Sequence, residues 1–124
     1  MTQLQSHSSE PAWNLPELLV RVENDQELLR DLLHIFKEGF PPMLQSLQSA
    51  LAASDWKNVV AISHKLHGML SNLAATRAAA AAGELETFAS TGDHGAIRGI
   101  LARLEQETTN LGIEIDAYLN GVRA

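Results

Sequence analysis

The sequence contains no cysteine, which excludes a disulfide framework and a zinc–thiolate site. Basic residues are scarce: nine Lys and Arg stand against fifteen Asp and Glu, for a formal net charge of −6. That balance excludes the concentrated basic stripe by which proteins bind nucleic acid. No apolar run approaches the roughly 20 residues of a membrane span, and no charged-then-apolar signal peptide opens the sequence. We therefore expect a cytoplasmic protein that neither binds nucleic acid nor inserts directly into a membrane.

The composition is that of one folded domain with a short polar lead. Hydrophobic residues make up 45% and charged residues 19% of the 124 residues, a length that can bury one modest core. Residues 1–12 are polar, contain three serines and a proline, and lack hydrophobic periodicity. They predict a disordered lead or linker, followed by one domain over residues 13–124.

Beyond the lead, apolar residues recur at helical spacing, and strand signals are absent. A short helix is predicted from Leu15 to Val22. A second helix should begin at Asn24, where Glu27 would complete a capping box. The pair Pro41-Pro42 should end it, because proline lacks the backbone N–H that continues a helix. A third helix should follow the prolines.

Three further helices complete the predicted domain. Asp55 should cap one that runs to about Leu73, Thr76 should cap the next, and Thr91-Gly92 should end it. Asp93 should begin the last helix. Short loops between long amphipathic helices favour antiparallel neighbours. The predicted fold is all-α, an antiparallel up-down four-helix bundle with additional short N-terminal helices.

One histidine stands apart from the apolar face of its helix. That face carries Val59, Ile62, Leu66, Met69, Leu70 and Leu73. At about 100° per residue, His64 projects roughly 160° from the centre of the stripe, so its imidazole is predicted to face solvent. Small residues (Ala61, Gly68, Ser71 and Ala75) share the outward face. An imidazole among small residues is accessible to the surface of another macromolecule.

The run from His64 to Ala75 resembles the signature of histidine-containing phosphotransfer (HPt) domains, roughly Ala-His-x-Leu-Lys-Gly-Ser-x-x-Asn-Leu-Gly-Ala. The resemblance covers roughly residues 13 to 120. Outside the signature it rests on Leu18, Leu19, Arg21, Val22, Asp25, Leu28, Leu29, Phe36, Asp55, Trp56, Leu85 and Glu86. It implies that His64 is the phosphoacceptor and that Gly68 and Asn72 support it. Without its side chain, Gly68 would let a partner's loop approach closely.

Three positions depart from the family pattern. His67 stands where the family has a lysine that is read as a cation near the phosphoryl group, Met69 replaces a serine and Ala74 replaces a glycine. Imidazole is largely neutral at pH 7, so His67 would fill the role of the lysine only in part. Lys65 is a second candidate cation, although it lies about 100° around the helix from His64. These changes bear on the transfer rate rather than on the identity of the phosphoacceptor.

The resemblance implies a phosphorelay intermediate of bacterial two-component signalling. His64 would accept a phosphoryl group from an aspartyl phosphate on a receiver domain and pass it to another receiver's aspartate. The implied partners are receiver domains of response regulators and a hybrid sensor histidine kinase, and the protein would be a monomer. The sequence holds no Gly-x-Gly-x-x-Gly or Walker-type loop, so we expect a phosphocarrier without kinase activity. No cofactor is expected on this chain, and the Mg²⁺ ion would belong to the partner receiver.

Two other functions fit the same residues. The changes at His67, Met69 and Ala74 also fit a binding module that has lost transfer and only sequesters response regulators. A bundle helix could instead promote dephosphorylation of receivers. Release of inorganic phosphate without a trapped phosphohistidine would mark that activity.

Other candidates are weaker. Lys57, two turns before His64 on the same face, and Arg77 could steer an acidic receiver surface. A docking patch could include Phe36, Phe40 or Met43. His64 and His67 have chelating spacing, but no carboxylate stands at Glu-x-x-His spacing on another helix, so no metal site is predicted. The remaining histidines, His7, His34 and His94, are expected to be solvated.

Overall fold

The structure, a computed structural model, describes residues 10–121. Every regular element among them is helical, which confirms the predicted all-α class. The elements in chain order are α1 (Leu15–Arg21), α2 (Gln26–Ala52), α3 (Trp56–Asn72), α4 (Thr76–Thr91), the 3₁₀ turn η2 (His94–Ala96) and α5 (Ile97–Leu119).

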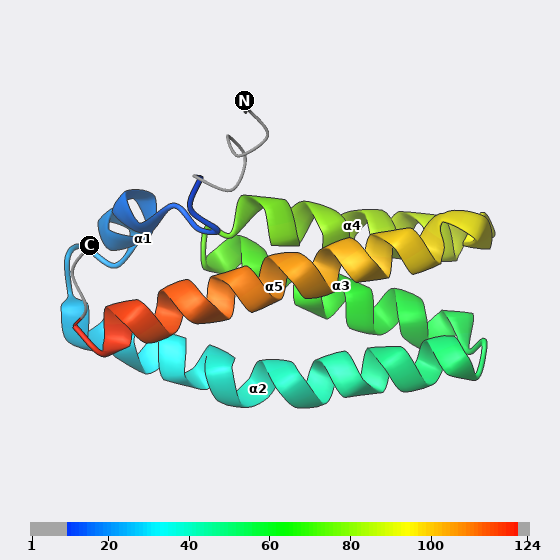
Figure 1. Cartoon of the computed structure of the whole chain (residues 1–124), viewed down its shortest axis with the longest axis horizontal. Helices are drawn as coiled ribbons and strands as arrows, with labels where there is room; N and C mark the ends of the chain where they lie inside the picture. The colour runs from blue at the N-terminus through cyan, green and yellow to red at the C-terminus, as the bar shows by residue number, and fades with distance from the viewer. Residues whose placement is uncertain (1–9, 122–124) are drawn as a thin grey trace, which may run out of the picture.

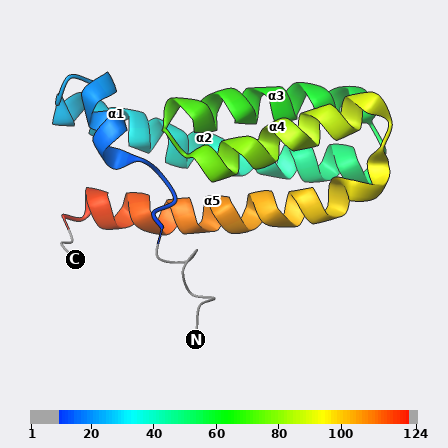
Figure 2. The same ribbon diagram turned by 90° about the horizontal axis from the view of Figure 1, so that it is seen from above.

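The four long helices lie lengthwise beside one another, and successive helices run in opposite directions (Figure 1). The short helix α1 sits at one end of this bundle, near the start of α2, as the view from above shows (Figure 2). It also reaches the end of α3, because Nη1 of Arg21 donates to the carbonyl of Ser71 at 2.9 Å. The up-down bundle is therefore as predicted, with one short helix before it in the described part of the chain.

Leucine and alanine divide the core between them. Leucines at the centre of the bundle are almost completely buried, among them Leu29, Leu33, Leu47, Leu66, Leu70, Leu85, Leu104 and Leu111. Burying one such side chain stabilises the fold by about 1.5–3 kcal/mol. Helix α4 instead buries mainly alanines, and these small side chains let it pack extensively against α3. No helix within residues 10–121 is both long enough and apolar enough to cross a membrane.

The prolines do not interrupt α2, contrary to the sequence prediction. Residues 26–52 form one helix that contains Pro41 and Pro42, so the predicted second and third helices are continuous. The physical reason is the apolar stripe, which runs past the prolines without a break: Phe36 and Phe40 are buried before them, and Leu47 after them. Both prolines face solvent. Burial on both sides thus offsets the two backbone hydrogen bonds that prolines remove.

The helix ends match the sequence in part. Asp55 caps α3 as predicted, with its carboxylate accepting from the backbone N–H of Asn58 at 3.4 Å, and Gly92 ends α4 at φ +87°. The other two predicted caps are each displaced by one residue. Asp25 rather than Asn24 caps α2, and Ala75 rather than Thr76 precedes α4 without a side-chain cap bond.

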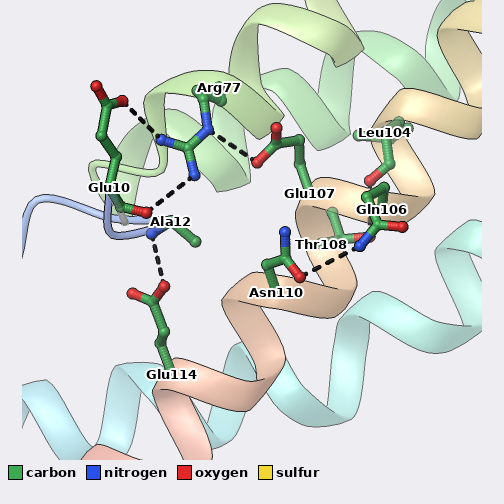
Figure 3. A network of polar contacts seen from close by, with 9 residues as sticks. All are labelled: Glu10, Ala12, Arg77, Leu104, Gln106, Glu107, Thr108, Asn110 and Glu114. Carbon is green, nitrogen blue, oxygen red and sulfur yellow. Dashed lines mark hydrogen bonds and ion pairs between the residues drawn. The ribbon is translucent and has the colours of Figure 1, made fainter. Parts of the chain in front are cut away.

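The predicted polar lead divides into two parts. Residues 1–9 lie outside the described residues. Residues 10–12, expected to be disordered, pack on the bundle: Ala12 is buried and its N–H donates to Oε2 of Glu114 at 2.8 Å. Beside it Arg77 donates from Nε to Glu107 at 3.0 Å and pairs with Glu10 at 3.3 Å (Figure 3). Contacts with α4 and α5 therefore order a segment that carries no helical pattern of its own.

Candidate functional site

His64 projects into solvent from the middle of α3. Its side chain is 73% exposed, whereas Val59, Ser63 and Leu66 of the same helix are completely buried. This is the orientation that the helical periodicity predicts. The imidazole is carried by a helix that is packed on its other side, so the backbone at His64 is held in place while the ring stays accessible to solvent.

A carboxylate on the next helix holds one nitrogen of this ring. Nδ1 of His64 lies 3.1 Å from Oε2 of Glu86, whose side chain is 29% exposed. An ionised carboxylate only accepts hydrogen bonds, so Nδ1 must carry the proton in this contact. The neutral ring then has its lone pair on Nε2. In this arrangement Nε2 is unprotonated and exposed, and a carboxylate orients the ring as it does in catalytic histidines, so Nε2 could act as a nucleophile.

The site prediction did not include Glu86, which entered only through the family resemblance. The signal that could have found it is the register of the α3–α4 hairpin. His64 and Glu86 each lie eleven residues from Ala75, at the turn between the two helices. Antiparallel helices joined by a tight turn bring such pairs to the same level.

His67 is half-buried, and its ring lies against Gly83 of α4. A Cβ atom added to Gly83 would lie 3.6 Å from both Cδ2 and Nε2 of the imidazole. These two residues lie eight positions from Ala75 on either side, so they follow the same register as His64 and Glu86. Alanine at position 83 would therefore make ordinary contact with the ring, whereas a longer side chain would collide with it. His67 stands beside His64, where the resemblance places a lysine.

Lys65 and Gly68 lie on the exposed part of α3. Lys65 lines an open groove between α2 and α3 with Met43, Ser46 and Ile62, on the other side of α3 from Glu86. Nothing lies within 4 Å of a Cβ atom added to Gly68, so the space one turn beyond His64 is open. A partner's backbone could approach the imidazole from this side.

The predicted docking face is only partly present. Lys57, Ala61 and Ser71 are exposed, as expected. Ala75 is completely buried, so its prediction as a docking residue is wrong. The helical pattern does not extend so far, because α3 ends at Asn72 and the backbone of Ala74 turns to φ +56°.

Asn72 is the exposed last residue of α3. Its carbonyl lies 3.5 Å from Nη1 of Arg21, the same group that donates to Ser71. The residue therefore sits where α1 holds the end of the histidine helix.

Three weaker predictions are wrong. Arg77 is not a free steering cation, because it is ion-paired with Glu107 and Glu10 (Figure 3). Phe36 and Phe40 are buried and stacked, with ring centroids 5.2 Å apart, so they cannot form a docking patch. His94, expected to be solvated, stacks on the indole of Trp56 with centroids 3.6 Å apart.

The remaining observations concern His34, groups that could hold a metal ion, and exposed apolar side chains. His34 is exposed, as expected. Among residues 10–121, no three His, Asp or Glu side chains are grouped to hold a metal ion. The large apolar side chains that are exposed there are Val20, Leu28, Leu32, Ile35 and Ile113.

Comparison with known proteins shows similarity over most of the chain. The model of the Hpt domain family matches residues 31–119. The crystal structure of histidine-containing phosphotransfer protein B (HptB) from Pseudomonas aeruginosa PAO1 is similar over 91% of this chain and 98% of that one. The two chains are 25% identical and superpose with a TM-score of 0.83. No curated protein matches the sequence.

Proposed function

Because the chain belongs to the Hpt domain family, we propose that His64 carries a phosphoryl group between the aspartates of two receiver domains. In its coarse form the function follows from the family: the chain takes part in histidine phosphotransfer in phosphorelays. The observation that supports the finer proposal is the contact between Nδ1 of His64 and Glu86, which leaves Nε2 free on an exposed ring.

The forward step uses this lone pair directly. Nε2 of His64 attacks the phosphorus of a receiver's aspartyl phosphate, forming a P–N bond while the P–O bond to the aspartate breaks. The aspartate leaves as a carboxylate with the bonding electron pair. The imidazole becomes cationic and keeps its proton on Nδ1, next to the carboxylate of Glu86. No proton needs to move, and Glu86 balances the charge that develops on the ring.

The onward step is the reverse of the first. A carboxylate oxygen of the second receiver attacks the phosphorus, and the P–N bond breaks with return of its electrons to Nε2. Phosphoryl transfer depends mainly on positioning and on charge stabilisation. In this proposal α3 and Glu86 position the imidazole, and the receiver domain supplies the Mg²⁺ ion. With no nucleotide-binding loop in its sequence, the chain acts as a carrier and does not phosphorylate itself.

The proposal is tested with the full chain and a phosphorylated receiver domain. We expect phosphate that is labile in acid and stable in alkali to appear on the chain and to map to His64. The variant His64→Gln should acquire none, whereas His67→Gln should still acquire it on His64. Phosphate on His67 of the unmodified chain, or labelling by ATP and Mg²⁺ without a kinase, would contradict the proposal.

The alternative of a binding module without transfer is supported by the three departures from the family pattern. One of these departures strains the backbone: Ala74 stands where the family has glycine and holds a left-handed φ of +56°. The two functions separate in one experiment. A chain that binds receivers and never exchanges phosphate with them would be the sequestering module, and appearance of phosphate on a second receiver would exclude it.

A further inference from the structure

Residues 10–22 form an arm that packs on the rest of the bundle. This N-terminal arm comprises the segment before α1, α1 itself and the residue that follows it. Four of its apolar side chains are buried: Ala12, Trp13, Leu18 and Val22. The Trp13 ring packs edge-on against Tyr118 of α5, with centroids 6.1 Å apart. Aromatic packing of this kind is specific, so the arm is held by contacts and not only by its covalent link to α2.

Polar contacts join this arm to the end of α3 and to the turn that follows. The backbone N–H of Asn14 donates to the carbonyl of Ala74 at 2.9 Å. Nη1 of Arg21 donates to the carbonyl of Ser71, as described above. Hydrogen bonds and apolar packing depend on position and not on chain connectivity. An identical arm from a second copy would therefore satisfy the same partners.

The linker between the arm and α2 has a strained backbone. Glu23 and Asn24 hold left-handed φ values of +55° and +61° in succession, and neither is glycine. This conformation is unfavourable for residues with a Cβ atom, although asparagine tolerates it better than glutamate does. The two residues lie where the chain turns back between α1 and α2 (Figure 1). Straightening of the linker would relieve both.

The apolar stripe keeps its helical phase across this linker. Buried positions on its two sides follow one another at spacings of four, seven and four residues: Leu18, Val22, Leu29 and Leu33. Such spacings place all four side chains on one face of a continuous helix. No glycine or proline stands between Glu17 and Glu38. Residues 15–52 can therefore form one helix, about 57 Å long, with an unbroken apolar stripe.

We propose that two copies of the chain exchange their N-terminal arms. In the exchanged dimer residues 23–25 are helical, α1 continues into α2, and each arm packs on the α3–α4 turn and α5 of the other copy. Every contact of the arm is kept, whereas the left-handed turn is lost from both chains. Exchange of an identical element is a low-cost route to dimers, and short hinges under strain favour it. Arm exchange does not depend on phosphotransfer.

The oligomeric state of the full chain tests this exchange. Because dimers form by mass action, the chain is refolded from urea at about 1 mM and, in parallel, at about 10 μM. Size-exclusion chromatography with light scattering should show a species of twice the monomer mass only after refolding at the higher concentration. The dimer should persist on dilution, since the arms must detach before the chains separate. A chain that stays monomeric after refolding at the higher concentration would overturn the proposal.

Asn24→Gly and Asn24→Ala form a matched pair of variants at an exposed linker position. Glycine holds a left-handed φ without strain and is a poor helix former, so Asn24→Gly should lower the dimer fraction. Alanine tolerates that φ less well than asparagine and is the better helix former, so Asn24→Ala should raise it. We expect the two dimerisation constants to differ by about tenfold or more. Equal constants, or a larger one for Asn24→Gly, would contradict arm exchange.

A second measurement identifies the contact that joins the two chains. Isotope-labelled and unlabelled chains are mixed before refolding, and isotope-filtered NOE spectra of the dimer should connect Trp13 of one copy with Tyr118 of the other. A dimer without these intermolecular NOEs would use another surface, and arm exchange would be wrong. The variant His64→Gln loses the proposed transfer but should dimerise like the unmodified chain, and a dimer that requires His64 would equally exclude exchange through the arm.

Discussion

His64 and His67 stand one turn apart on α3 and meet α4 in opposite ways. His64 is mostly exposed and has one nitrogen against the carboxylate of Glu86, while His67 is half-buried with its ring against Gly83. Both residues lie within α3, three positions apart. The difference in chemistry comes from the facing residue on α4, an acid in one case and a glycine in the other. A neighbouring helix can therefore give two histidines of one helix different surroundings, a carboxylate beside one ring and a glycine beside the other.

Of the substitutions that test this difference between the two histidines, removal of the Glu86 carboxylate should have the largest effect. We expect Glu86→Ala to slow phosphoryl acceptance from a receiver by about 10- to 100-fold, by analogy with the loss of a carboxylate that orients a metal-ligating histidine. Glu86→Gln should be milder, because the amide oxygen can still accept from Nδ1–H. The direct readout is the tautomer of His64 by ¹⁵N NMR, which should shift toward protonation on Nε2 in Glu86→Ala. An unchanged tautomer together with an unchanged rate would show that Glu86 does not orient the ring.

Filling the space at the second histidine should affect stability rather than transfer. Gly83→Leu places a large side chain where His67 now lies, and overpacking of this kind costs about 1–3 kcal/mol. Urea denaturation measures the loss. Because His64 and Glu86 lie one turn away, phosphoryl acceptance by the folded variant should change by less than about threefold.

The matched control for that substitution is Gly83→Ala. A Cβ atom there would make ordinary contacts at 3.6 Å, and alanine is the better helix former by about 1 kcal/mol. This variant should be as stable as the unmodified chain or more stable. A loss of stability in Gly83→Ala would show that His67 needs the whole of the space.

A smaller change in stability, and a gain, is expected from substitution of Ser63, the neighbour of His64 on the buried side of α3. The hydroxyl of Ser63 is completely buried and has no hydrogen-bond partner among the described residues. Leaving a buried polar group unpaired costs about 1–3 kcal/mol, so Ser63→Ala should raise the free energy of unfolding by about 1 kcal/mol. Transfer should not change, because the position of His64 depends on the backbone of α3. Destabilisation by Ser63→Ala in urea would mean that the hydroxyl is paired in solution.

The smallest expected effect on stability concerns the turn between α3 and α4. This turn sets the register that pairs His64 with Glu86 and His67 with Gly83. Ala74 holds φ +56°, a conformation that costs an L-residue about 1–2 kcal/mol. Ala74→Gly should remove this strain, and after the entropy cost of glycine the net gain should be about 0.5 kcal/mol. Thermal unfolding can detect it, and Gly92→Ala, at φ +87°, is the converse control and should destabilise. A lower melting temperature for Ala74→Gly would contradict the strain argument.

The sequence predicts what depends on a single helix and fails where two helices meet. The exposure of His64, the cap at Asp55 and the glycine end of α4 follow from periodicity and from local backbone chemistry. The pairing of His64 with Glu86 does not, because it depends on the register between α3 and α4. The role of His64 as phosphoacceptor and the supporting roles of Lys65 and Asn72 stay predictions.

The errors in α2 and at Ala75 have related causes. Local rules end a helix at Pro41, but burial of Phe40 and Leu47 on either side continues it. Periodicity carried past Asn72 places Ala75 outside, but the chain has already turned there into the next helix. In both cases tertiary packing overrides a rule that holds for an isolated helix.

The two prolines also give α2 an uneven internal strength. Pro41 and Pro42 have no N–H to donate, so the carbonyls of Lys37 and Glu38 lack their usual partners within the helix. The helix is therefore weakest between its two halves. One half shares a groove with the part of α3 that carries His64, and the other lies at the end of the bundle where α1 sits (Figure 1). Fraying of the outer half can stop at this weak point, so that one end of the bundle can open while His64 keeps its position.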